Sequence, residues 1–301
     1  MISGLNSSTD RFLNDLAATS RRVERAQQQV TSGKRIAVAS DDPDQISRLV
    51  EDRSLFAATE QVKSGLSRVK TEVDSSEAAL ASAVKLLDRA RVIAAQGATS
   101  TATPEMRRAM ADELGNILEE LVATSNTTVG GRFVFSGDND QTPGYGIDLT
   151  QATPVTPFNG AASTRRVMDA SGGTFATART AQEIFDSSNP SESVFGSVNE
   201  LRLALMADDV PAIEAAAGDV GSAGLFLNAQ QAYYGAVQNR VNAAIDNASS
   251  TEVRLKSEIG AIEDADMVQA ATELAEATFQ RNAALAARGR VPRNSLFDFL
   301  A

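Results

Sequence analysis

The residues of this sequence that could do chemistry are mostly carboxylates, because its 301 residues include no His and no Cys. The absence of both removes the commonest general base, the commonest metal ligand and every Ser-His or Cys-His nucleophile. Carboxylate chemistry, a Ser-Lys pair and an oxygen-ligand site for calcium or magnesium remain open. None has convincing spacing, so we expect a protein that is not an enzyme and needs no cofactor.

Two acidic clusters have the composition of a metal or catalytic site but not its spacing. Residues 40–44, Ser-Asp-Asp-Pro-Asp, lack the alternating acids and the glycine of a calcium loop. They fit the start of a helix better, with Asp42 as N-cap, Pro43 in the first helical position and Asp44 in the first turn. Residues 263–266, Glu-Asp-Ala-Asp, lie in helix-compatible sequence and are typical of a solvated helical face. We predict no catalytic, cofactor-binding or metal-binding residue.

The composition favours long helices rather than a round core. Hydrophobic residues make up 43% of the chain, whereas aromatic residues make up 5% and Trp is absent. The formal net charge of −11 disfavours nucleic acid and anionic membrane surfaces as partners. No stretch approaches the roughly 18 apolar residues of a membrane span, and the first residues do not form a standard secretory signal peptide. These features alone predict a soluble cytoplasmic protein without membrane insertion.

Apolar residues near both ends of the chain are spaced for helix pairing. Near the N-terminus they follow a seven-residue repeat, which predicts a coiled-coil helix, and a similar pattern returns near the C-terminus. The residues that we expect to form this terminal seam are Leu5, Phe12, Leu16, Val23, Val30, Met267, Leu274, Leu285, Leu296, Phe297, Phe299 and Leu300. A single amphipathic helix is marginal in water, so we expect the two ends to pair and the remaining apolar surface to form an assembly interface.

The middle of the chain changes character once. Helical patterns run from residue 43 to 96 and from 104 to the glycine pair at 130–131, which we interpret as a helix end. Residues 131–137, Gly-Arg-Phe-Val-Phe-Ser-Gly, predict a strand, and Pro, Gly, Ser and Thr are frequent from there to residue 195. Helical sequence then returns from residue 198 and continues past Pro211 as one long stretch.

The expected fold is therefore mainly α. It is an elongated antiparallel helical bundle or coiled coil formed by the N- and C-terminal segments, with a small β-rich insertion domain at the tip. Residues 1–40 and 261–301 form the terminal domain, residues 41–137 and 196–260 the helical core domain, and residues 138–195 the insertion. Periodicity alone does not separate this plan from methyl-accepting receptors, tail-fibre components or type III secretion needles.

Specific motifs at both ends resemble the flagellin superfamily. Residues 29–36, Gln-Val-Thr-Ser-Gly-Lys-Arg-Ile, followed by Ser-Asp-Asp-Pro at 40–43, are similar to its N-terminal motif. Residues 262–267, Ile-Glu-Asp-Ala-Asp-Met, are similar to the C-terminal counterpart. Within the superfamily, residues 131–137 and the terminal Ser-Leu-Phe-Asp-Phe-Leu at 295–300 resemble the members at the junction of hook and filament rather than filament flagellins.

The resemblance implies a structural, non-enzymatic protein of the extracellular bacterial flagellum, exported through the flagellar type III channel without a cleaved signal peptide. This expectation replaces the cytoplasmic one. It also implies a homo-oligomer, a ring or layer in a tubular assembly at the hook-filament junction, with terminal helices inside and the insertion outside. The implied partners are the first hook-associated protein, flagellin and an export chaperone. Two alternatives stay open: a short filament flagellin, and an appendage protein with an enzymatic insert at residues 138–195.

Overall fold

The protein is mainly helical and divides into two compact units. The structure, a computed structural model, describes residues 3–168, 173–187 and 189–289, with side chains from residue 9 onward. Unit 1 combines residues 1–58 with 251–301, and unit 2 comprises residues 59–250. The division falls inside two long helices, α2 (Pro43–Gly97) and α6 (Val210–Glu263). The segment boundaries at residues 40 and 260 stay predictions.

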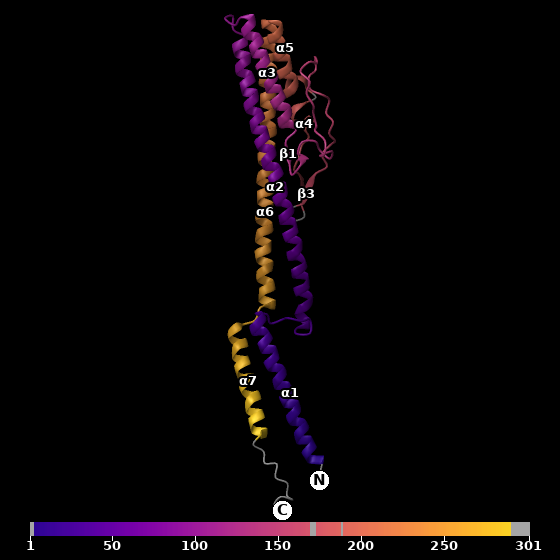
Figure 1. Cartoon of the computed structure of the whole chain (residues 1–301), viewed down its shortest axis with the longest axis vertical. Coiled ribbons are helices and arrows are strands. Elements are labelled where there is room, and N and C mark those ends of the chain that lie inside the picture. Colours follow the sequence, from indigo (N-terminus) through magenta and orange to yellow (C-terminus); the bar gives the residue numbers. More distant parts are fainter. Residues whose placement is uncertain (1–2, 169–172, 188, 290–301) are drawn as a thin grey trace, which may run out of the picture. The chain divides into compact units, whose positions relative to one another are not determined.

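Unit 1 brings the two ends of the described chain together. Helix α1 (Ser3–Ser32) contacts α7 (Met267–Gly289) along its length. Arg22 donates a hydrogen bond to Gln280 at 3.3 Å, and Arg288 donates one to Thr9 at 2.9 Å. Because residue numbers fall along α1 as they rise along α7, the two helices are antiparallel (Figure 1). The pairing of terminal segments that the apolar spacing predicted is present.

Unit 2 contains α3 (Pro104–Ser125), α5 (Val194–Ala207) and the adjoining parts of α2 and α6. Helix α3 begins where the sequence indicated, because the Thr103 hydroxyl accepts a hydrogen bond from the Met106 amide at 3.3 Å and Pro104 occupies the first helical position. The single helix expected from residue 198 onward is wrong. Asp208 has a φ of 55°, and this left-handed residue ends α5 and separates it from α6.

One end of unit 2 is made by two turns that a buried arginine joins. Arg107 donates to the carbonyl oxygens of Gly97 at 2.8 Å and Thr99 at 3.0 Å, both at the end of α2. Its other guanidinium nitrogen donates to the Asp208 carboxylate at 2.5 Å, where α5 ends. The bond to Gly97 satisfies a carbonyl at the end of α2, and together the three bonds fix the α2–α3 turn against the α5–α6 turn.

The segment between α3 and α5 contains two short antiparallel hairpins. Strand β1 (Thr128–Val129) pairs with β2 (Arg132–Phe133), and β3 (Arg166–Met168) pairs with β4 (Thr174–Ala176). Residues 130–131 are the two-residue turn of the first hairpin. Both glycines have positive φ, 59° and 80°, as a type I′ turn requires. The interpretation of this pair as a helix end is wrong, because α3 already stops at Ser125.

The β-rich character expected of residues 138–195 is mostly irregular chain in the described part. The strand predicted over residues 131–137 continues only to Phe133. At Gly137 φ is 67°, and a Cβ there would lie 1.8 Å from the Ala161 carbonyl oxygen, so the crossing chain excludes a side chain. Side-chain hydrogen bonds take the place of backbone bonds between strands here. The Asn126 side-chain amide, for example, donates to the Tyr145 carbonyl at 2.7 Å. Short polar runs with Pro and Gly favour such loops over strands.

The insertion packs along the side of the helices of unit 2 (Figure 1). Besides the β3–β4 hairpin it contains α4 (Ala181–Phe185) and the 3₁₀ helix η1 (Pro190–Glu192). Phe135 is fully buried and meets Phe185 and Tyr234 edge to face, with ring centroids 6.2 and 6.1 Å apart. Burial of these aromatic rings stabilises the insertion against α6, which carries Tyr234. Within unit 2, the insertion therefore lies beside the helices rather than at the end that Arg107 joins.

Helix α6 is the one described helix that is long and apolar enough to cross a membrane by length and composition, which the apolar runs of the sequence did not indicate. Several of its apolar side chains, including Val220, Leu227 and Val241, are fully buried in the core of unit 2. Core helices of this kind pass the same test, so the property is weak evidence for a membrane span.

We predict that Phe135→Ala lowers the free energy of unfolding of unit 2 by about 3–5 kcal/mol, because it leaves a cavity beside two other aromatic rings. Urea unfolding followed by near-ultraviolet circular dichroism measures this, since all three Tyr residues lie in unit 2. The control is Leu225→Ala, whose side chain is 75% exposed and whose effect should stay within about 0.5 kcal/mol. Equal effects of the two substitutions would contradict the packing role of Phe135.

Candidate assembly interface

The seam of α1 faces α7 in the register that the seven-residue repeat predicted. Val23 and Ala26 are buried, and Phe12, Leu16 and Val30 are half-buried, whereas the residues between them are mostly exposed. The guanidinium of Arg288, near the end of α7, lies 5.4 Å from the Phe12 ring centroid. The apolar side of α1 is thus covered in part by α7.

On α7 the contacting residues are smaller than expected. Ala270 and Ala277 are buried and Leu274 between them is half-buried, which is one seven-residue repeat. Met267 and Leu285, which the sequence assigned to the seam, are 47% and 49% exposed. Alanine lets two helices approach closely, so the narrow contact forms along the alanine column and the larger side chains stay outside it. Only Leu274 of the three predicted α7 residues lies in the contact.

The remaining seam residues lie outside what the structure describes. These are the side chain of Leu5 and residues Leu296, Phe297, Phe299 and Leu300. Their assignment to an assembly interface stays a prediction.

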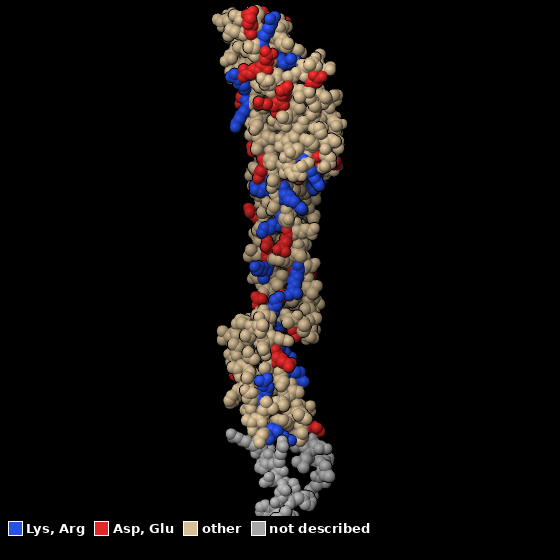
Figure 2. Space-filling view, viewed as in Figure 1, with Lys and Arg blue, Asp and Glu red and all other residues tan. Residues whose placement is uncertain are grey.

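Pairing leaves an apolar surface uncovered on unit 1. Val268 and Phe279 of α7 are 77% and 74% exposed. Leu285 and Met267 on the same helix are about half exposed. Leu13 of α1 is also more than half exposed. Figure 2 shows that the visible face of α7 carries few charged residues. Several large apolar side chains exposed on one helix are typical of a surface that another protein covers.

The helix ends of unit 1 are joined by backbone hydrogen bonds. Gly33 ends α1 with a φ of 70°, and its carbonyl accepts from the Ala265 amide at 2.9 Å. The Arg35 amide donates to the Glu263 carbonyl at 2.7 Å, and Lys34 and Asp264 form an isolated bridge between them. The two motifs that resemble the flagellin superfamily are therefore side by side.

A buried carboxylate lies at this joint. The side chain of Glu263 is 4% exposed and forms ion pairs with Lys34 of the first loop and with Arg53 of α2, the latter at 2.5 Å. Burial by itself raises the pKa of Glu263, but hydrogen bonds from Lys34 and Arg53 and their charges outweigh it and hold that pKa below its ordinary value. Ile36, Leu49 and Ile262 form a small apolar cluster in the same unit. The joint thus combines a paired charge with apolar packing.

The sequence analysis singled out the acidic residues of this joint, but it did not predict which residues they contact. Glu263 was expected on a solvated face, and it is buried. Asp266 accepts hydrogen bonds from the Val268 and Gln269 amides at 2.9 and 3.1 Å, which is an N-cap for α7. The Asp42 carboxylate, expected as an N-cap, accepts from Arg35 at 2.9 Å. The available signal was the basic pair Lys34-Arg35 in the N-terminal motif, but no spacing rule joins positions more than 200 residues apart.

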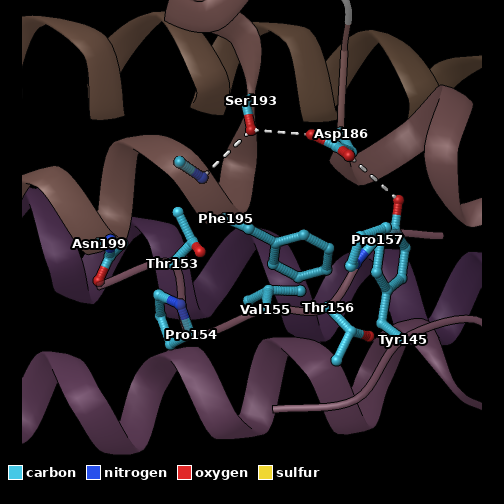
Figure 3. A pocket seen from close by; sticks show the side chains of 11 residues that line it. Tyr145, Thr153, Pro154, Val155, Thr156, Pro157, Asp186, Ser193, Phe195 and Asn199 are labelled. Atoms are coloured by element: carbon cyan, nitrogen blue, oxygen red, sulfur yellow. Dashed lines mark hydrogen bonds between the residues drawn. The ribbon is translucent and has the colours of Figure 1, made fainter. Parts of the chain in front are cut away.

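Unit 2 contains a cavity of about 460 Å³, lined by residues of the insertion and of α5, that we consider as a possible catalytic or binding site (Figure 3). Its polar groups bond to one another: Tyr145 donates to Asp186 at 3.5 Å, and Ser193 donates to the same carboxylate at 3.4 Å while accepting from the Gly196 amide. Burial, then the charge and hydrogen bond of Asp186, raise the pKa of Tyr145, so its hydroxyl stays protonated. These bonds hold the insertion against α5. No group of three potential metal ligands occurs among the described residues.

The fold and the interface together define a class: a mainly helical protein whose paired terminal helices keep uncovered apolar surface. Two family models match it, the bacterial flagellin N-terminal helical region over residues 5–140 and the bacterial flagellin C-terminal helical region over residues 218–300. Together they cover well over half of the chain. The chain belongs to the flagellin superfamily, and it is a structural component of the bacterial flagellum.

Individual relatives come from two branches of this superfamily. The chain is 25% identical over 237 residues to flagellar hook-associated protein 3 of Escherichia coli, covering 77% of this chain and 71% of that protein. It is 27% identical over 304 aligned residues to flagellin of Bacillus subtilis, covering 94% and 95%.

Solved structures share the fold. A flagellar hook-associated protein of Vibrio parahaemolyticus aligns with a TM-score of 0.66 at 22% identity, covering 74% of this chain and 99% of that one. FlgL of Xanthomonas campestris aligns with a TM-score of 0.61 at 18% identity, covering 70% and 100%. These alignments confirm the mainly helical fold class that the sequence predicted.

We predict that Glu263→Gln lowers the free energy of unfolding of unit 1 by about 2 kcal/mol, because it leaves two cations beside a neutral group. Hydrogen exchange of the amides of α1 and α7, corrected for intrinsic rates, measures the loss. Since the folded pKa lies below the ordinary value of 4.5, this stabilisation is present above pH 4.5 and disappears as the pH falls through the folded pKa. In the Glu263→Gln variant, the free energy of unfolding of unit 1 should therefore not show this decrease as the pH falls.

The matched control for this prediction is Glu276→Gln, an exposed glutamate on the same unit's helix α7. It should leave both the exchange rates and their pH dependence unchanged. If Glu263→Gln behaves like this control, the buried ion pairs do not stabilise the joint.

Proposed function

We propose that this protein is a non-enzymatic building block of the hook-filament junction of the flagellum, where it connects a hook-associated layer to the flagellin filament. The observation that carries the proposal is the antiparallel α1–α7 pair with Phe279 and Val268 exposed on its outer face. Such a pair is incomplete as a hydrophobic core, and neighbouring copies complete it. Similarity to hook-associated protein 3 supports the junction as the location.

The proposed partners follow from this location. Copies of the chain form a ring or layer in a tubular assembly, with the first hook-associated protein on one side and flagellin on the other. The chain reaches this place by export through the flagellar type III channel without a cleaved signal peptide, and an export chaperone holds it before secretion. Satisfied polar groups in the cavity beside α5 support a structural rather than a catalytic insertion.

A short filament flagellin is the second candidate. The similarity to Bacillus subtilis flagellin spans nearly the whole of both chains, which favours a filament subunit. The two candidates differ in assembly. A filament subunit adds to its own kind without limit, whereas a junction protein adds one limited layer.

We expect cells that lack the gene for this protein to make hooks without filaments and to release flagellin into the medium. Electron microscopy of the cells and immunoblotting of the medium measure both. Restoring the gene on a plasmid is the control. Motile cells with normal filaments would contradict the junction role and would favour a minor flagellin.

We expect Phe279→Asp to abolish addition of the protein to hooks while leaving the helical content of the free chain unchanged, because a charge in a buried apolar contact costs several kcal/mol. Leu225→Asp is the control, since Leu225 is equally exposed but lies in unit 2. Leu16→Asp and Leu274→Asp should also block assembly, but by separating α1 from α7. Sedimentation with purified hooks measures addition, and normal sedimentation of Phe279→Asp would contradict the interface.

A further inference from the structure

A groove of about 690 Å³ runs along unit 2 between α2 and the β1–β2 and β3–β4 hairpins. One wall is α2 from Val62 to Glu72, and the other is made by the β1–β2 turn and by β3. The glycine turn at 130–131 brings Arg132 to the rim, since a two-residue turn reverses the chain in the shortest distance. The groove therefore depends on the hairpin turn that the sequence did not reveal.

The rim of the groove is basic. Arg68, Arg132 and Arg166 line it and are exposed, and Glu72 is the one acidic residue in the lining. Glu72 already pairs with Arg165 at 3.4 Å. Lys and Arg side chains gather beside β1 and β3 on the visible face (Figure 2). The groove is thus a local excess of positive charge in a chain whose net charge is −11.

The three arginines keep most of their hydrogen-bonding capacity. Arg68 makes no ion pair or hydrogen bond with any residue that the structure describes. Arg132 lies 3.5 Å from Asp140, a carboxylate that Arg165 contacts more closely at 2.7 Å. Among the residues that the structure describes, Arg166 donates to Thr174 alone, at 3.4 Å. Each guanidinium has five N–H donors in a planar fork, so all three retain donors for carboxylates.

The floor of the groove is apolar. Leu66 is buried, and Val69, Val129 and Val167 are half-buried beneath the arginines, with Met168 exposed at the edge. A free anion would gain nothing from this floor, whereas a peptide segment would bury apolar side chains there while its acids met the rim. The combination fits a protein surface rather than an inorganic ion.

We propose that this groove binds an acidic segment of a second copy of the chain, and so forms a contact between neighbouring subunits through unit 2. The excess of 39 acidic over 28 basic residues means that another copy offers many carboxylates. The same excess repels nucleic acid over long distances, so a phosphate backbone is a poorer occupant. In the proposed assembly this groove contact is additional to the terminal interface. It does not require that the assembly lie at the hook-filament junction.

The test uses the full chain with Thr71→Cys, an exposed groove residue that becomes the only thiol in the protein. A benzophenone attached to this thiol cross-links whatever occupies the groove on illumination. At about 1 mM chain, the concentration range that assembly imposes locally, we expect cross-links to acidic peptides of a second, isotopically labelled copy. Mass spectrometry identifies the peptide and distinguishes contacts between copies from contacts within one.

Removing the positive charge should weaken the contact. Arg68→Ser with Arg166→Ser should reduce the intermolecular product about tenfold, as should a change from 0.1 to 1 M salt, which shortens the Debye length from about 10 to about 3 Å. The control combines Arg91→Ser with Arg108→Ser, which removes the same charge from exposed positions elsewhere on unit 2. This control should leave the product unchanged.

Three results would overturn the proposal. One is the absence of intermolecular product at this concentration, and another is a product that neither the groove variant nor salt reduces. The third is cross-linking only to nucleic acid or to another protein when these are added. The Phe279→Asp variant separates this proposal from the terminal interface, because it should lose addition to hooks and retain the groove cross-link.

Discussion

The ion pairs of Glu263 with Lys34 and Arg53 are the interaction on which unit 1 depends. A buried carboxylate is unfavourable unless cations and donors surround it, so this position holds only when the N-terminal loop, α2 and the end of α6 meet. Backbone bonds from Arg35 and Ala265 complete the joint. The direction in which α1 and α7 leave unit 1's joint is thereby constrained, and their antiparallel contact follows.

The contact between α1 and α7 is narrow because alanines make it. Ala270 and Ala277 permit close approach but bury little area, and the larger Phe279 and Val268 stay exposed. A helix pair with such a small buried area is marginal by itself. In the assembly proposed above, burial of the outer face would supply the stabilisation that the pair lacks.

Unit 2 obtains its stability differently. Its helices share a continuous core to which the insertion contributes the aromatic residues Tyr145 and Phe185, and the chain just before it contributes Phe135. The polar groups around Asp186 bond to one another, whereas the arginines of the groove use only part of their hydrogen-bonding capacity on residues that the structure describes. Polar groups that satisfy one another stabilise the fold, and donors left at the rim of an apolar groove are available to a partner.

Sequence periodicity determined the helical class, the seam of α1 and the start of α3 at Thr103, because these rest on contacts between residues three to seven positions apart. The missing His and Cys likewise exclude catalysis by an imidazole or a thiol of this chain, because composition alone decides which reactive groups the chain possesses. The tertiary structure alone decided the burial of Glu263, the alanine register of α7, the hairpin turn at residues 130–131 and the loops of the insertion. Each of these features depends on a residue distant in the chain or on the close approach of two backbone segments. The type of a charged residue or glycine in the sequence does not indicate which distant residue will contact it.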